Sequence, residues 1–134
     1  MTIDAKVLRD TLEIALTRDD FAERFYARLF AQHPECQPLF KRNSAGAQNK
    51  MFAQKLCAIV DAIEEPERVV AEASAIAKTH AEYGVRDEMY GWVGDALVAT
   101  LRDANGDDWS DEAERSWSAA YEALAAAIRA PRAG

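Results

Sequence analysis

The sequence predicts an all-α protein folded as a single domain over residues 1–134, and three observations support this prediction. Apolar residues recur at i, i+3, i+4 and i+7 through almost the whole chain, which is the spacing of one face of a helix. No segment alternates apolar and polar residues for long enough to form a strand. The length of 134 residues suits one domain with one core.

Three helical segments are expected in the first third of the chain. Apolar residues on one face predict an amphipathic helix over 4–17. A second helix, capped by Asp19 or Asp20, ends at Gln32, and its wide aromatic face indicates burial on more than one side. A proline then ends this helix and opens a short turn of helix over 34–40.

Four more helices are expected in the rest of the chain. Ser44 can cap a helix that runs to about Ile63, and Pro66 opens the next one. Asp87 starts a helix that ends before an Asn-Gly turn signal. Ser110, followed by two acidic residues, starts the last helix.

Composition and charge exclude several classes of function. Hydrophobic residues make up 49% and charged residues 29% of the chain, as in ordinary globular proteins. A net charge of −7 argues against a nucleic acid or an anionic membrane surface as partner. Neither a signal peptide nor an apolar run of ~20 residues is visible, so we expect a cytoplasmic protein. Cys36 and Cys57 have no metal-ligand spacing and are expected to be reduced thiols.

The most unusual stretch is one in which a histidine ends an apolar stripe. His80 follows Ala73 and Ile76 on one helical face. Gly84 can end this helix in a left-handed conformation, with Val85 turning back to the core. A buried imidazole needs a hydrogen-bond partner or a metal ion, and a histidine satisfied within the core is the alternative.

Two other polar side chains lie on faces that helix packing should bury, Tyr26 and Gln48. An unpaired buried polar group costs about 1–3 kcal/mol, so three on three helices suggest one shared site with His80. In the alternative, Tyr26 bonds a backbone carbonyl, Gln48 faces solvent at a helix start, and His80 caps its own helix. No serine or cysteine nucleophile has a credible base among only two histidines, so hydrolytic chemistry is not expected.

The order and spacing of several segments resemble those of a bacterial single-domain globin, similar to the haem domain of flavohaemoglobins. The resemblance covers nearly the whole chain, and the segments that carry it are Phe25–Phe30, Pro34–Phe40, Lys78–Val85, Met89–Gly94 and Trp117–Tyr121. It implies a globin fold of about six to eight helices around one haem pocket, with haem b as the cofactor.

The resemblance assigns roles to the unusual residues. His80 would be the proximal ligand of the haem iron, and Phe40 would wedge against the haem from its loop. Tyr26 and Gln48 would lie on the opposite, distal side, where Phe52 limits the pocket. A phenol O–H and an amide N–H can both donate a hydrogen bond to bound dioxygen.

Further positions follow from the same resemblance. Val85, Tyr90 and Val93 are expected to contact the haem. Because the loop after residue 40 is shorter than in flavohaemoglobins, Ala47 is the alternative to Gln48 at the distal position. The family also has a carboxylate near the end of the last helix that makes the proximal histidine a stronger electron donor. No acidic residue stands at that place here, and no flavin domain is present, so any turnover would need a separate reductase.

The resemblance implies a protein that binds dioxygen reversibly, and carbon monoxide or nitric oxide as well, at a pentacoordinate iron for storage, delivery or sensing. One alternative is a nitric oxide dioxygenase that works with a separate reductase, so enzymatic activity stays open. Another is a haemless globin-like signalling domain. A monomer and a homodimer are both compatible with the sequence.

Overall fold

The computed structural model describes residues 3–40, 45–83 and 87–129, without the side chains of 39, 40, 45, 66, 79–83, 87 and 129. Helices account for almost all of this part of the chain, and it contains no strand, which confirms the all-α prediction. The elements are α1 (Ala5–Leu16), α2 (Phe21–Gln32), the 3₁₀ helix η1 (Pro34–Phe40), α3 (Ala45–Ala62), α4 (Pro66–Tyr83), α5 (Asp87–Asn105), the 3₁₀ helix η2 (Gly106–Asp108) and α6 (Asp111–Arg129).

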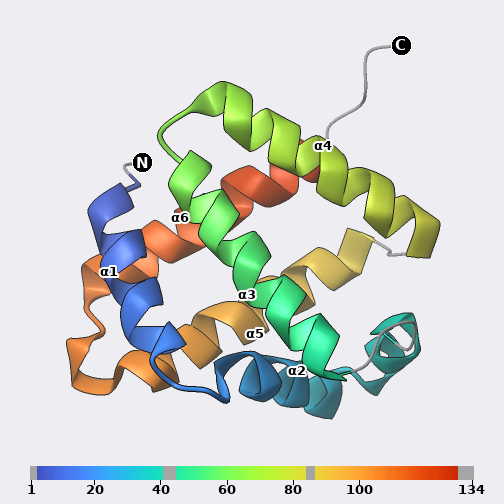
Figure 1. The fold of residues 1–134 in the computed structure, drawn as a ribbon, viewed down its shortest axis with the longest axis horizontal. Helices are drawn as coiled ribbons and strands as arrows, with labels where there is room; N and C mark the ends of the chain where they lie inside the picture. Colours follow the sequence, from blue (N-terminus) through green and yellow to red (C-terminus); the bar gives the residue numbers. More distant parts are fainter. Residues whose placement is uncertain (1–2, 41–44, 84–86, 130–134) are drawn as a thin grey trace.

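The helices cross one another at steep angles around two central members, α5 and α6 (Figure 1). α5 packs against α1, α2 and α6, while α3 contacts α1, α2 and α4. α4 lies across one end of the molecule, where its partners are α3 and α6. This arrangement places α2, α3, α4 and the first half of α5 around the region in which the sequence predicts a site.

The observed helix boundaries follow local signals, with one exception. The Asp4 carboxylate accepts hydrogen bonds from the first backbone amides of α1, and Ser110 accepts one from the Ala113 amide at 3.0 Å. Asp20 occupies the expected cap position of α2 but makes no capping hydrogen bond. Its carboxylate instead accepts a hydrogen bond from Arg24 at 2.7 Å, because the arginine one turn later is a charged donor.

Buried polar groups tie α1 to the two central helices. The Trp117 indole N–H donates to the Thr11 hydroxyl at 2.7 Å, and the Thr11 carbonyl accepts a hydrogen bond from the Asn105 amide at 3.1 Å. The same amide nitrogen donates to the Leu101 carbonyl at 2.9 Å. Each of these bonds satisfies a donor that burial would otherwise leave unpaired, so they fix how α1, α5 and α6 meet.

The apolar core consists of a large and a small cluster. The large cluster joins α1, α2, α3, α5 and α6 and includes Leu8, Phe25, Leu29 and Leu101, each at most 2% exposed. The small cluster is centred on Ala73, Leu124 and Ile128, and it holds α4 against α6. Cys36 is buried and Cys57 half-buried, and neither forms a disulfide.

A close contact between α5 and α6 requires glycine at one position. The ring of Tyr121 covers Gly94, and a Cβ atom at residue 94 would lie 2.5 Å from Tyr121 Cε2. The Tyr121 hydroxyl also donates a hydrogen bond of 2.5 Å to the Tyr90 carbonyl. α6 therefore holds the first turn of α5 through both ring packing and a hydrogen bond.

We expect Gly94→Ala to lower the free energy of unfolding by about 1–3 kcal/mol, because the added methyl group displaces the Tyr121 ring. Gly91→Ala is the matched control, since a Cβ atom there meets nothing within 4 Å. On helix propensity the control should stabilise the protein by up to about 1 kcal/mol. Urea unfolding of both variants measures the difference, and equal stabilisation by the two would contradict the described α5–α6 contact.

Candidate functional site

Aromatic rings form the contact between α2 and α3. Phe25 and Phe52 stack with ring centroids 4.3 Å apart and planes at 8° to each other. The Tyr26 ring lies 5.6 Å from Phe52 and 5.9 Å from Phe30, again between centroids. The two adjacent stripes of α2 thus have different roles: Phe25 fills the core, and Tyr26 borders it together with Phe52.

Burial makes the phenol of Tyr26 harder to ionise than that of an exposed tyrosine. Burial raises the pKa of the Tyr26 phenol to about 12, because the charged phenolate would lose its hydration. Any tyrosine is protonated at neutral pH, and this shift disfavours the phenolate further, so Tyr26 is a neutral hydrogen-bond donor. Such a donor on an apolar, aromatic surface suits a ligand that carries partial negative charge.

The first turns of α3 carry both candidates for the second distal position. Gln48 is half-buried and precedes Phe52 by one helical turn, so the two residues lie on the same side of α3. Ala47 is exposed. The residue with the polar side chain is therefore the one turned toward the protein.

α4 carries His80, the predicted iron ligand, one helical turn after Ile76. Ile76 packs against the small core cluster, to which Ile59 of α3 and Tyr90 of α5 also contribute. The imidazole of His80 lies outside the described side chains, as does the ring of Phe40, and Val85 lies outside the described residues altogether. For these three residues the assigned roles remain predictions.

Two predicted contact residues lie on successive turns of α5. Tyr90 is half-buried and belongs to the small cluster, and its backbone carbonyl is the one held by Tyr121. Val93 packs against the large cluster. The predicted residues with described side chains therefore fall into two groups. In the first group Tyr26 contacts Phe52, and Gln48 lies on the same side of α3 as Phe52. The second group consists of Tyr90 and Val93 on α5.

Sequence reasoning missed a stacked pair beside these residues. The His33 ring stacks on Trp92 of α5, with centroids 4.1 Å apart and planes at 8°. His33 Nδ1 also lies 3.6 Å from a Glu35 carboxylate oxygen. The second histidine of the chain therefore lies between an indole ring and a carboxylate. The sequence hints at the place of His33 only through Pro34, which follows it and ends α2 there.

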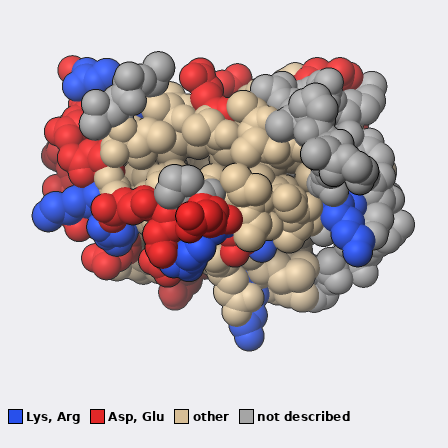
Figure 2. Space-filling model, turned by 90° about the horizontal axis from the view of Figure 1, so that it is seen from above, with Lys and Arg blue, Asp and Glu red and all other residues tan. Residues whose placement is uncertain are grey.

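The surface charge is mixed. Figure 2 shows acidic side chains over the left end of the visible face and along its upper edge, with basic ones among those at the left and a broad uncharged area in the middle. No helix in the described ranges is both long and apolar enough to cross a membrane. Those ranges also contain no group of three or more histidine, cysteine, aspartate or glutamate residues that could hold a metal ion.

Comparisons with known proteins agree with this architecture. The globin family model matches residues 23–128, and the chain therefore belongs to the globin family. A bacterial globin from Campylobacter jejuni has a similar structure, with a TM-score of 0.78, 25% identity, and coverage of 92% of this chain and 90% of that one. The globin fold expected from the sequence is confirmed.

Two kinds of relative are similar in sequence. A flavohemoprotein of Rhizobium meliloti is 37% identical over 77% of this chain, and one of Bordetella pertussis is 35% identical over 90%. The chain spans only 26% and 29% of the length of these two proteins. A leghemoglobin of Psophocarpus tetragonolobus is 34% identical, over 78% of both chains.

The raised pKa of Tyr26 predicts a pH dependence of stability. A tyrosine in the unfolded chain loses its proton near pH 10, whereas folded Tyr26 keeps it to about 12. Between these values the folded state binds more protons, so the free energy of unfolding falls as the pH rises from about 10 to about 12. Tyr26→Phe should remove this part of the decline in urea unfolding measured across that range. Identical pH dependence in the two proteins would contradict the described burial of the phenol.

Proposed function

We propose that this globin holds haem b and binds dioxygen reversibly, with His80 as the iron ligand. The observation that carries the proposal is Tyr26: a neutral phenol, partly buried on an aromatic surface, next to Phe52 and on the side of α3 that also bears Gln48. The flavohemoprotein and leghemoglobin relatives support haem as the group that these residues face.

The residues present fit a flat apolar cofactor. Half-buried apolar side chains occur on all four helices around the proposed site, and a haem between them would cover surface that the protein leaves partly exposed. They are Tyr26 and Phe30 of α2, Phe52 and Ile59 of α3, Ile76 of α4, and Tyr90 and Val93 of α5.

Bound haem would supply the ferrous iron at which dioxygen, carbon monoxide and nitric oxide bind. The chain itself would supply the ligand and the surroundings. The phenol of Tyr26 would donate a hydrogen bond to the gas, and the amide of Gln48 would donate a second. We favour Gln48 over Ala47 for this role because Gln48 is half-buried and Ala47 is exposed. Phe52 would limit the space beside them, and Phe40 would wedge against the cofactor from its own segment of the chain.

A nitric oxide dioxygenase is the second candidate, and the similarity to flavohemoproteins favours it. The same two donors would stabilise the negative charge that develops when dioxygen attacks nitric oxide. The matched region is about a quarter of the length of those proteins, and in this role the electrons would come from a reductase. The location we propose for either role is the cytoplasm.

Absorption spectra of the purified protein test the cofactor and its ligand. We expect a strong haem band, a five-coordinate ferrous form, and loss of this spectrum in His80→Ala, because the iron loses its protein ligand. Val70→Ala is the control, because Val70 is an exposed residue of the same helix and its substitution keeps the imidazole. A six-coordinate ferrous spectrum would contradict the distal assignment. Absence of a haem band after addition of hemin would leave the haemless alternative.

Release of dioxygen tests the role of Tyr26. Tyr26→Phe removes the donor and keeps the ring, so the dissociation rate should rise by about tenfold or more, as expected for loss of ~1.5–3 kcal/mol of hydrogen bonding to a charged acceptor. Tyr121→Phe is the matched control, because its hydroxyl donates to a backbone carbonyl. Stopped-flow displacement by carbon monoxide measures the rates, and an unchanged rate in Tyr26→Phe would exclude this donor.

The rate of dioxygen release and the rate of nitric oxide consumption together separate the two functions. Slow dioxygen release together with rapid consumption of nitric oxide by the oxygenated protein favours the dioxygenase. Rapid release favours storage, delivery or sensing, since these roles require that bound dioxygen dissociate again. The iron ligand and the distal donors are the same in both cases, so only rates distinguish them.

A further inference from the structure

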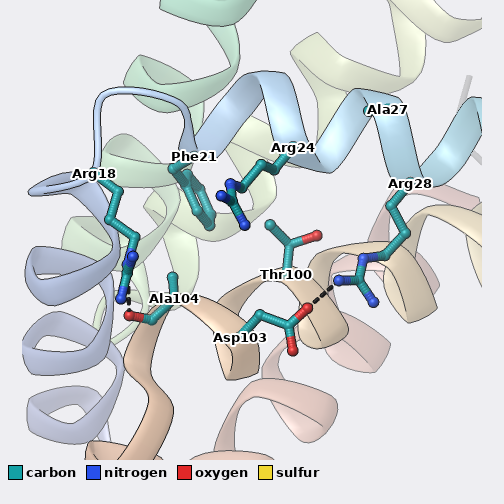
Figure 3. Close-up of a pocket in the computed structure, with 8 residues that line it drawn as sticks. All are labelled: Arg18, Phe21, Arg24, Ala27, Arg28, Thr100, Asp103 and Ala104. Atoms are coloured by element: carbon teal, nitrogen blue, oxygen red, sulfur yellow. Dashed lines mark hydrogen bonds and ion pairs between the residues drawn. The ribbon is translucent and has the colours of Figure 1, made fainter.

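A pocket of about 160 Å³ lies between α2 and the last third of α5, apart from all the residues assigned to haem (Figure 3). Its upper wall in the figure carries three arginines, with Arg24 between Arg18 and Arg28. Arg18 comes from the turn between α1 and α2, and the other two come from successive turns of α2. The remaining lining residues are Phe21, Ala27, Thr100, Asp103 and Ala104.

The three guanidinium groups use only part of their hydrogen-bonding capacity within the protein. Each has five N–H donors. Arg18 donates through Nε to a backbone carbonyl at the end of α5 at 3.0 Å, and Arg24 donates through Nε to Asp20 at 2.7 Å. Arg28 donates through one terminal nitrogen to Asp103. Within the described part of the chain, the terminal nitrogens of Arg18 and Arg24 have no hydrogen-bond partner.

The pocket has an excess of positive charge in a chain whose net charge is −7. Its three arginines face two carboxylates, Asp20 and Asp103. Arg24 pairs with Asp20 at 2.7 Å and lines the same pocket as Asp103, and both carboxylates raise its pKa, Asp20 more strongly. The negative end of the α5 dipole and the positive start of the α2 dipole also border the pocket and roughly offset each other. One cationic charge therefore remains uncompensated.

The floor of the pocket is apolar and its size is limited. Phe21 is 2% exposed and Ala104 is 7% exposed. These two side chains exclude water from one side of the pocket, whereas the Arg24 and Asp103 side chains are exposed to solvent. The volume is several times the roughly 30 Å³ that a water molecule occupies and well below the roughly 300 Å³ of typical small-molecule pockets. These properties suit a small, strongly charged ligand rather than a nucleotide or a peptide.

We propose that this pocket binds a small oxyanion of the phosphate class, either inorganic phosphate or the phosphoryl group of a small phosphomonoester. The terminal nitrogens of Arg18 and Arg24 hold the oxygens, since guanidinium groups pair with phosphate through two parallel N–H donors. Arg28 contributes charge while it stays paired with Asp103. The proposal does not depend on haem or on any gas, because it rests on a different set of residues.

NMR titration of the protein, in its ferrous carbon monoxide form when it carries haem, tests this site. Inorganic phosphate and glycerol phosphate are added separately at constant ionic strength. We expect saturable shifts of the arginine Nε–H signals of Arg18 and Arg24 and of backbone amides in 18–28 and 100–104. Equal shifts with both ligands identify the phosphoryl group alone as the determinant. Tighter binding of glycerol phosphate identifies the phosphomonoester as the ligand. Shifts spread over the basic surface without saturation would overturn the proposal.

Charge substitutions provide the matched controls. Arg24→Gln should weaken phosphate binding about fivefold to tenfold, through loss of one charge-assisted contact. Arg68→Gln is its control, because Arg68 is also exposed and pairs with Glu65, three residues earlier in the sequence. Binding equally weakened by both would mean nonspecific attraction and overturn the proposal.

Asp103→Asn should tighten binding, since it removes a competing carboxylate from the pocket. Unchanged or weaker binding in a folded variant would contradict the proposed location.

Discussion

The packing of α5 on several sides at once is the constraint on which the rest of the structure depends. Residues that point in different directions around this helix are all buried: Ala96, Leu97, Val98, Thr100 and Leu101 are each at most 8% exposed. Only the stripe that carries Asp95, Arg102 and Asp103 is exposed, and α1, α2 and α6 pack around the rest of the helix. The absence of a side chain at Gly94 allows the Tyr121 ring of α6 to approach closely. The position of the first turn of α5, and with it Tyr90, follows from this crossing.

Helix boundaries could be predicted because they depend on local chemistry. Pro34 and Pro66 start helices where a missing amide hydrogen costs nothing, and Ser110 makes the capping bond expected of it. Asp20 shows where such reasoning ends. Its carboxylate can bond either the backbone or Arg24, and the structure has the arginine. A choice between two nearby donors depends on geometry that residue spacing does not contain.

The candidate site shows the same division. Periodicity placed Tyr26, Gln48 and Phe52 on inward faces, and all three are at least half-buried. The stack of His33 on Trp92 joins residues far apart in the chain and has no periodic signal. The arginine pocket was also missed, because Arg24 and Arg28 lie on an outward face of α2 that an amphipathic pattern assigns simply to solvent, while Arg18 lies in the preceding turn. Contacts between distant elements, rather than patterns within one helix, create both features.

The separate small cluster under α4 has a consequence for how the protein opens. α4 is held by α3 and α6 through few large side chains: Ala73, Leu124 and Ile128 form the centre of this contact. We expect a helix secured in this way to open more readily than the α1–α5–α6 centre, and to exchange its amide hydrogens faster. A ligand that bridges α4 to α3 stabilises the closed form of this unit by mass action. If the proposed haem lies between these two helices, its binding and the closing of α4 are two descriptions of one equilibrium.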